Sequence, residues 1–334
     1  MQSVVLGLKE SVLRDLDPWL CHDCGDCSAT CPREAEPRQS MATLRRYLTA
    51  EYDWSGISRR ILRSLGFEIA ALGTAALAVL ALIIWYHLTI VKLDVATFRS
   101  TAMGLEHMFP RIWYFTVAVF LIPASFVLTS IYRMHRLTMR KAAIPLRFYT
   151  AEAKALLVNT VAHVEILKCA AVDRRKKWTM HWMLAAGCVL LVFVKFFFLR
   201  WFQTDQIYPL YHPQRWLGYL GAAGILAGAG QILVDWFRER KPQHLSSRRS
   251  DLTLPVLLVA TAVSGLAVHV CRCAGLGLTA QYLYALHLMI AVPMLLVEVP
   301  FGHWAHMIYR PLALYFAAVR ARAAEELDRE AVAA

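Results

Sequence analysis

Apolar residues gather in six long stretches that are separated by polar and basic segments. The stretches cover approximately residues 66–90, 112–132, 179–200, 216–236, 252–271 and 280–299. As a helix, each is long enough to cross a hydrocarbon core of roughly 30 Å. A helix also satisfies all the backbone polar groups of a single segment inside lipid. The pattern therefore predicts an all-α membrane protein, a bundle of six transmembrane helices.

Composition and charge agree with a multi-pass membrane protein. Of the 334 residues, 58% are hydrophobic, and the mean hydropathy of +0.43 is too apolar for an ordinary soluble domain. The net charge is +12, and Lys and Arg are concentrated in the loops after the second and fourth stretches. The positive-inside rule then places both termini in the cytoplasm. This alternation explains the charge better than a nucleic-acid-binding surface does, so no nucleic acid is expected as a partner.

Four cysteines before the first apolar stretch have the spacing of a bacterial ferredoxin. Cys21, Cys24, Cys27 and Cys31 precede Pro32 in the pattern C-x2-C-x2-C-x3-C-P. A structural zinc site would pair two separated C-x2-C arms, and disulfides are disfavoured in a reducing cytoplasm. The run therefore predicts a cytoplasmic 4Fe–4S cluster. Because the fourth cysteine ligates the other cluster in two-cluster ferredoxins, Cys31 either completes this cluster or pairs with a run on a partner chain.

These features divide the chain into three parts. Residues 1–64 form a small N-terminal cytoplasmic segment, ferredoxin-like and iron–sulfur-binding, with a linker. Residues 65–310 form the six-helix membrane domain, and residues 311–334 form a cytoplasmic C-terminal tail. Within the membrane domain, the long cytoplasmic loop 137–178 mixes apolar and charged residues. That mixture suggests an interfacial amphipathic helix or a docking surface for soluble partners.

Histidines near the ends of the apolar stretches are candidate haem ligands. His107 and His287 lie on the outer side, and His181 and His306 lie on the inner side. On a continuous helix, the 19 residues between the last pair (306 − 287) span about 28 Å, so one helix offers a ligand near each face. Two imidazoles from facing helices give a six-coordinate b-type haem. We predict an outer haem held by His107 with His287 and an inner haem held by His181 with His306.

Other interpretations of these ionisable residues stay open. A histidine near a membrane surface is often only a hydrogen-bonded interface residue, which is the interpretation we give to His87, His135, His163, His212, His244 and His269. His303 competes with His306 for the inner site. A 19-residue separation is also about 100° out of helical phase, so Pro293 or Pro300 would have to redirect one ligand. Lys195, Glu298 and His303 are candidates for a quinone site or proton route, although snorkelling also explains Lys195 or Glu298.

Several motifs resemble one known family. The resemblance runs through Trp19-Leu20-Cys21-His22-Asp23-Cys24, Cys31-Pro32-Arg33, Leu44-Arg45-Arg46-Tyr47, His287-Leu288 and Pro300-Phe301-Gly302. Together with His181 and His306, these motifs follow in order the pattern of the membrane subunit of quinone-interacting membrane-bound oxidoreductase, the QmoC type. Members of this family look like a heterodisulfide-reductase C-like ferredoxin motif fused to a nitrate-reductase gamma-like dihaem b domain.

The resemblance implies a membrane electron-transfer subunit that does not itself act on the soluble substrate. Electrons would pass between a 4Fe–4S cluster, two b haems and the membrane (mena)quinone pool. The implied partners are soluble flavin and iron–sulfur subunits of a heterodisulfide-reductase-like complex, linked to adenylylsulfate reductase and sulfur metabolism. Family members carry two cysteine runs and this chain carries one. A membrane subunit for a tricarballylate-type flavoprotein dehydrogenase has a similar build and is one alternative function. A second alternative, outside electron transfer, is a non-redox membrane anchor or transporter in which the cysteines bind a structural metal.

Overall fold

The computed structural model describes residues 6–22, 25–91, 109–139, 144–168, 174–239 and 249–333, and all the regular structure in these ranges is helical. Six helical segments are long and apolar enough to cross a membrane. In chain order, the main α-helices of these six segments are α7 (Leu65–Tyr86), α9 (Phe109–Met139), α12 (Arg174–Phe197), α14 (Pro213–Val234), α16 (Thr253–Cys273) and α17 (Gly277–Pro293). The helical class and the six apolar helices are confirmed, and they fit a multi-pass membrane protein.

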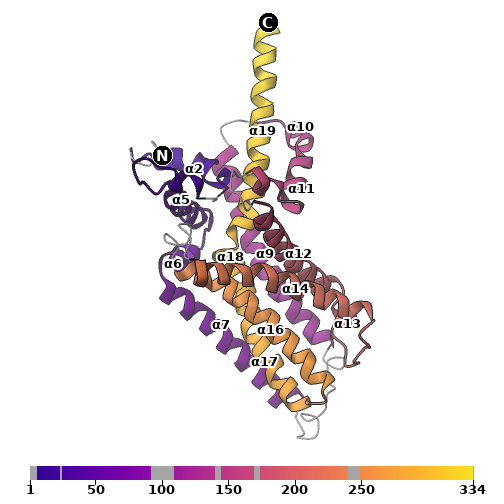
Figure 1. Cartoon of the computed structure of the whole chain (residues 1–334). Helices are drawn as coiled ribbons and strands as arrows, with labels where there is room; N and C mark the ends of the chain where they lie inside the picture. The colour runs from indigo at the N-terminus through magenta and orange to yellow at the C-terminus, as the bar shows by residue number, and fades with distance from the viewer. Residues whose placement is uncertain are drawn as a thin grey trace.

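The apolar helices form one bundle, and the N-terminal segment lies at one end of it (Figure 1). Helices α12, α14, α16, α17 and α7 each contact the next in this order, and α9 contacts the end of the last span. The N-terminal helices are α2 (Lys9–Arg14), α3 (Asp17–Leu20), α4 (Asp26–Ala29), α5 (Pro37–Tyr52) and α6 (Ile57–Arg63). We call their end of the bundle the N-terminal end and the opposite end the far end.

Small residues bring the backbones of α12 and α14 into contact. A Cβ atom added to Gly224 would lie 2.6 Å from the carbonyl oxygen of Met183. On the facing helix, a Cβ atom on Gly187 would lie 2.6 Å from the carbonyl oxygen of Gly221. Apolar burial does little to drive helix association in lipid, so close backbone packing between small residues supplies much of the attraction.

The last span is interrupted between the two histidines that the sequence places on it. Helix α17 continues as the π-helix η6 (Met294–Glu298) and the short α18 (Val299–Phe301). Residues 302–304 are not helical, and α19 (Ala305–Ala333) then leaves the bundle at its N-terminal end (Figure 1). The separation and phase calculated for a continuous helix therefore do not apply to His287 and His306, because a π-turn and a break lie between them.

The N-terminal segment is packed onto α9 and α19 by a buried aromatic cluster. The rings of Trp19 and Tyr52 each lie 5.2 Å, centroid to centroid, from the ring of Tyr309 on α19. Trp19 is 1% exposed and Tyr52 is fully buried. Such rings bury about 150–250 Å² each. Helices α10 (Leu146–Ala151) and α11 (Ala153–Val161) pack against α19 as well, so the loop 137–178 contributes helices to the same end of the bundle.

Candidate functional site

The cysteine run lies in the loop and short helix between α3 and α5. Cys21 follows α3, Cys27 lies in α4, and Cys31 precedes the turn into α5; Cys24 lies outside the described residues. Cys21 and Cys31 are half-buried, and Cys27 is exposed. Helix α4 begins after Gly25, whose φ of 85° is left-handed and favours glycine. The run thus starts at the packed face of the N-terminal segment and reaches its surface at Cys27.

Helix α5 holds both ends of this loop. The guanidinium of Arg45 donates one hydrogen bond to the carbonyl of Pro18 at 2.6 Å and another to the carbonyl of Cys21. At the other end, the backbone N–H of Arg38 donates to Ser28 Oγ at 3.3 Å. The Arg45 contacts place a permanent positive charge beside Cys21.

Arg310 connects the cysteine run to the histidines at the N-terminal end of the bundle. Its Nη2 lies 2.7 Å from His22 Nδ1. A guanidinium only donates, so His22 Nδ1 is the acceptor and the proton of its neutral ring lies on Nε2. Burial and the charge of Arg310 lower the pKa of His22. Arg310 also lines a cavity of about 30 Å³ with His163, His181 and His306.

The predicted inner pair, His181 and His306, does come together at that cavity. The two ring centroids are 6.4 Å apart. Two imidazoles on opposite sides of one metal ion, with metal–nitrogen bonds of about 2 Å, would have centroids about 6 Å apart. His306 Nδ1 lies 2.8 Å from the carbonyl of His303, which can only accept, so the lone pair of His306 is on Nε2. His181 Nδ1 is buried without a hydrogen-bond partner among the described residues.

The donor atoms of this pair fit a metal, but the enclosed void does not fit a porphyrin. A void of 30 Å³ is about the volume of one or two water molecules. His306 is exposed, so its ring borders accessible space as well as the void. A haem between this pair would have to occupy that accessible space. His163, for which the sequence predicts only an interface role, has its ring 5.0 Å from that of His181. Its local sequence carries no sign of this proximity.

His287 lines a separate and much larger cavity. The cavity has a volume of about 330 Å³ and is lined by apolar residues of α12, α14, α16 and α17. This volume is within the range of small-molecule and cofactor sites. The cavity runs from the loop 203–208 at the far end to Trp304, and its polar lining includes Lys195, Arg215, His269, Arg272 and Tyr284. A large apolar cavity with two histidines and several cationic side chains has a lining suited to an acidic macrocycle such as haem.

The hydrogen bonds of His287 present its Nε2 as a ligand. Ser264 Oγ lies 2.9 Å from His287 Nδ1 and 3.1 Å from the carbonyl of Thr261. A hydroxyl has one proton, and the Thr261 carbonyl can only accept it, so His287 Nδ1 donates to Ser264. The lone pair is then on Nε2. Gly265 allows this ring to lie close, because an added Cβ atom would be 3.1 Å from His287 Cε1. His107, the predicted partner of His287, lies outside the described residues.

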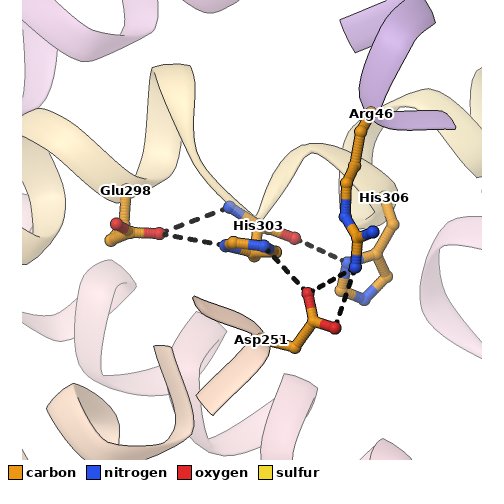
Figure 2. Close-up of polar contacts among 5 residues, drawn as sticks. All are labelled: Arg46, Asp251, Glu298, His303 and His306. Atoms are coloured by element: carbon orange, nitrogen blue, oxygen red, sulfur yellow. Dashed lines mark hydrogen bonds and ion pairs between the residues drawn. The ribbon is translucent and has the colours of Figure 1, made fainter. Parts of the chain in front are cut away.

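The three candidates for a quinone or proton route occupy two different places. Lys195 lines the large cavity, where its Nζ lies 4.5 Å from the centroid of the Phe202 ring. Glu298 and His303 belong to a buried polar cluster near the N-terminal end, drawn with its neighbours in Figure 2. In this cluster His303 Nε2 lies 3.1 Å from Asp251 Oδ1, and Arg46 Nη2 lies 2.7 Å from the same oxygen.

Sequence reasoning missed three members of this polar cluster. Glu68 on α7, Asp251 on η5 (Arg249–Leu252) and Arg46 on α5 come from segments far apart in the chain. Glu68 had a detectable signal, because it is a carboxylate early in an otherwise apolar span. Asp251 and Arg46 lie in polar segments where charged residues are ordinary, and although Arg46 belongs to the motif Leu44-Arg45-Arg46-Tyr47, nothing local indicated its contact with Asp251.

Comparison with known proteins gives one relative. The chain is 35% identical over 65 residues to a heterodisulfide-reductase C-like protein of Archaeoglobus profundus. The alignment covers 20% of this chain and 35% of that protein, so the chain spans about a third of the length of the curated relative it matches. No protein-family model matches the chain, and no solved structure matches it. The chain therefore contains a segment similar to a heterodisulfide-reductase C-like protein, together with six helices of membrane-spanning length.

Proposed function

We propose that this chain is the membrane electron-transfer subunit of a quinone oxidoreductase complex of the QmoC type. The cluster-binding residues are Cys21, Cys24, Cys27 and Cys31, and the haem ligands are His107, His181, His287 and His306. When bound, the 4Fe–4S cluster and the two b haems supply one-electron chemistry, and the protein supplies their positions and surroundings. The similarity to a heterodisulfide-reductase C-like protein supports an iron–sulfur electron-transfer role.

One contact carries this proposal. Arg310 binds His22, the residue after Cys21, and also lines the cavity that His181 and His306 share. A single side chain thus ties the cysteine run to the histidine pair. Electron transfer between two centres requires that the protein hold them in a fixed relation, and a docked segment with a bridging arginine provides that relation. A non-redox anchor or transporter has no need of this coupling.

The large cavity supports a path onward from this pair towards the far end. Its lining extends from Trp304, which is two residues before His306, to His287 and then to Arg272. His287 is the proposed ligand of the second haem, with His107. Lys195 lies in the same lining and is our candidate proton donor for a quinone, whose reduction takes up two protons.

The proposed division of the chain is the one that the sequence predicts. Residues 1–64 bind the cluster, residues 65–310 carry the haems, and residues 311–334 form a tail that continues α19. The proposed partners are soluble flavin and iron–sulfur subunits of a heterodisulfide-reductase-like complex, which would approach the end where Cys27 is exposed. The proposed location is a prokaryotic inner membrane with this end in the cytoplasm, and the proposed pathway is adenylylsulfate reduction.

Spectroscopy of the purified chain tests this function. Reduction with dithionite is expected to produce the sharp visible bands of six-coordinate b haem, and His181→Ala and His306→Ala are each expected to remove one of two haems. His212→Gln is the matched control, because His212 caps α14 and lines neither histidine cavity. Cys21→Ser is expected to lose iron and labile sulfide, whereas Cys271→Ser retains both. Unchanged haem in both histidine variants, or unchanged sulfide in Cys21→Ser, would refute the proposal.

A further inference from the structure

A buried cluster of two carboxylates and an imidazole joins the first and last spans. Glu68 on α7 and Glu298 at the end of η6 are both fully buried. One ligand atom from each of these residues and one from His303 lie within 4.8 Å of one another. This triad is distinct from both histidine cavities, because none of its three members lines either of them.

Within the described part of the chain, three of the four carboxylate oxygens of the triad lack the partners that buried anions require. Neither oxygen of Glu68 has a hydrogen-bond partner among the described residues, and Glu298 Oε1 has none either. A buried ionised carboxylate is strongly destabilised unless it is paired or coordinates a metal. Two of them within contact distance add their mutual repulsion. The triad therefore offers a cation closely spaced carboxylate oxygens that have no hydrogen-bond partner among the described residues.

His303 is oriented by a carboxylate on its other side. Its Nε2 lies 3.1 Å from Asp251 Oδ1, while its Nδ1 faces Glu298 Oε2 at 3.9 Å (Figure 2). Arg46 Nη2 lies 2.7 and 2.8 Å from the two Asp251 oxygens. This pairing keeps Asp251 an acceptor, so when the His303 ring is neutral its proton is favoured on Nε2, beside Asp251, and its lone pair is on Nδ1. A histidine that binds a metal through one ring nitrogen commonly donates the N–H of the other ring nitrogen to such a carboxylate.

The backbone next to Glu298 donates a hydrogen bond to one oxygen of its carboxylate and leaves the other oxygen without a partner among the described residues. The N–H of His303 lies 3.3 Å from Glu298 Oε2. Gly302 makes this approach possible, because an added Cβ atom would overlap Oε2 and lie 2.7 Å from Glu298 Cδ. The other oxygen, Oε1, is the one without a partner among the described residues. The π-turn that ends at Glu298 also belongs to a class of helix irregularity that is frequent at functional sites.

A metal ion binds the deprotonated forms of these ligands, that is, two carboxylates and a neutral imidazole. In that state Arg46 and Asp251 cancel, and the two negative charges of Glu68 and Glu298 match the charge of one divalent cation. Carboxylate oxygens combined with imidazole suit Zn²⁺, Mn²⁺ or Fe²⁺ better than Ca²⁺, which takes oxygen ligands.

We propose that Glu68, Glu298 and His303 bind one divalent transition-metal ion, with Asp251 and Arg46 as the residues that position His303. The ion ties α7 to the end of η6 and, through Arg46, ties both to α5 of the N-terminal segment. His303 also accepts a hydrogen bond from His306 through its carbonyl, so the metal site and the histidine pair share one turn of backbone. This proposal does not depend on the proposed electron-transfer function.

Metal binding to the purified full chain tests this site independently of haem or cluster content. After treatment with EDTA, Mn²⁺ is added and free Mn²⁺ is followed by its electron paramagnetic resonance signal. We expect one tight site per wild-type chain, loss of that site in Glu68→Gln and in Glu298→Gln, and roughly 10- to 100-fold weaker binding in Asp251→Asn. Glu326→Gln, whose carboxylate forms an ion pair with Arg147 on the surface, is the control and is expected to bind as wild type.

A stability measurement distinguishes a metal ion bound by Glu68 and Glu298 from protons held by the same two carboxylates. EDTA is expected to lower the Tm of the wild type and to leave the Tm of the Glu68→Gln/Glu298→Gln double variant unchanged, because that variant has no charge for a cation to neutralise. Added Zn²⁺ should restore the wild-type Tm. If the wild type binds Mn²⁺ and Zn²⁺ no better than the double variant and EDTA does not change its Tm, the carboxylates hold protons only and the metal site is refuted.

Discussion

Replacing Trp19 with alanine should release the cysteine run from the membrane domain. Trp19 is 1% exposed, lies in the last turn before Cys21, and packs against Tyr309 on α19 and Tyr52 on α5. Truncating a buried Trp to Ala costs about 3–5 kcal/mol, which combines lost apolar burial with the cavity left behind. Every 1.4 kcal/mol is a factor of ten, so local opening of this segment becomes roughly a hundred- to a few thousand-fold more frequent.

Hydrogen exchange measures that opening directly. Amides of residues 9–20 in detergent-solubilised Trp19→Ala should exchange faster by that factor, while amides in the middle of α14 and α16 keep their wild-type rates. Trp54→Ala is the matched control, because Trp54 is 59% exposed and its main ring contact is a stack on Phe126 with centroids 5.8 Å apart. Its loss should cost about 1 kcal/mol. If residues 9–20 of Trp19→Ala exchange as slowly as those of Trp54→Ala, the aromatic cluster does not dock the segment.

Two further predictions concern helix packing and pH. Gly228→Ala should destabilise the bundle by about 1–3 kcal/mol, because the new Cβ atom would lie 2.6 Å from the carbonyl oxygen of Met180. The loss would be measured as a lower Tm. Gly230→Ala on the same helix is the control, because its new Cβ atom meets nothing within 4 Å and should leave the Tm unchanged. Docking of the N-terminal segment should weaken as the pH falls through the ordinary His22 pKa of 6.5, because the folded-state pKa is lower and the undocked state then binds more protons.

The sign of the pH effect follows from the hydrogen bond to Arg310. Protonation of His22 Nδ1 removes the acceptor and places two positive charges together, so docking is strongest at neutral and higher pH and weakens towards acid pH. His22→Asn keeps a side-chain acceptor without a titrating ring. Exchange rates for residues 9–20 should therefore rise between pH 7.5 and pH 5.5 in the wild type, after correction for intrinsic exchange, and stay level in the variant. An equal rise in both would show that another group is responsible.

The spans could be predicted from the sequence because their cause is local. A run of about twenty apolar residues has one stable arrangement in lipid, whatever the rest of the chain does. The described helices begin and end near the expected limits, as for α16 (Thr253–Cys273) against 252–271. The interruption of the last span was harder to predict, because Pro293 and Pro300 mark where irregularity is allowed but not its form. The structure keeps Pro293 inside α17 and places the break at Gly302.

The candidate sites also include features that a local motif predicts and features that depend on tertiary packing. The cysteine run is a local motif, so its spacing alone predicts a cluster. The pairing of His181 with His306 was also expected, because both lie at the same end of their spans, and their rings are 6.4 Å apart. The proximity of His163 to this pair was not foreseen, since it depends on how the loop before α12 folds back. His163 has a φ of 49°, an unusual conformation that only the folded chain imposes.

Hydropathy and cysteine spacing by themselves determined that this is a six-helix membrane-type chain with a thiolate motif at one end, since both patterns act within a single segment. Tertiary structure alone decided that Arg310 would join that motif to a histidine pair and that Glu68 would meet Glu298 and His303. His22 and Arg310 are 288 residues apart, and Glu68 and Glu298 are 230 residues apart (298 − 68). Contacts over such separations depend on how whole helices pack, and no local pattern of residues carries that information.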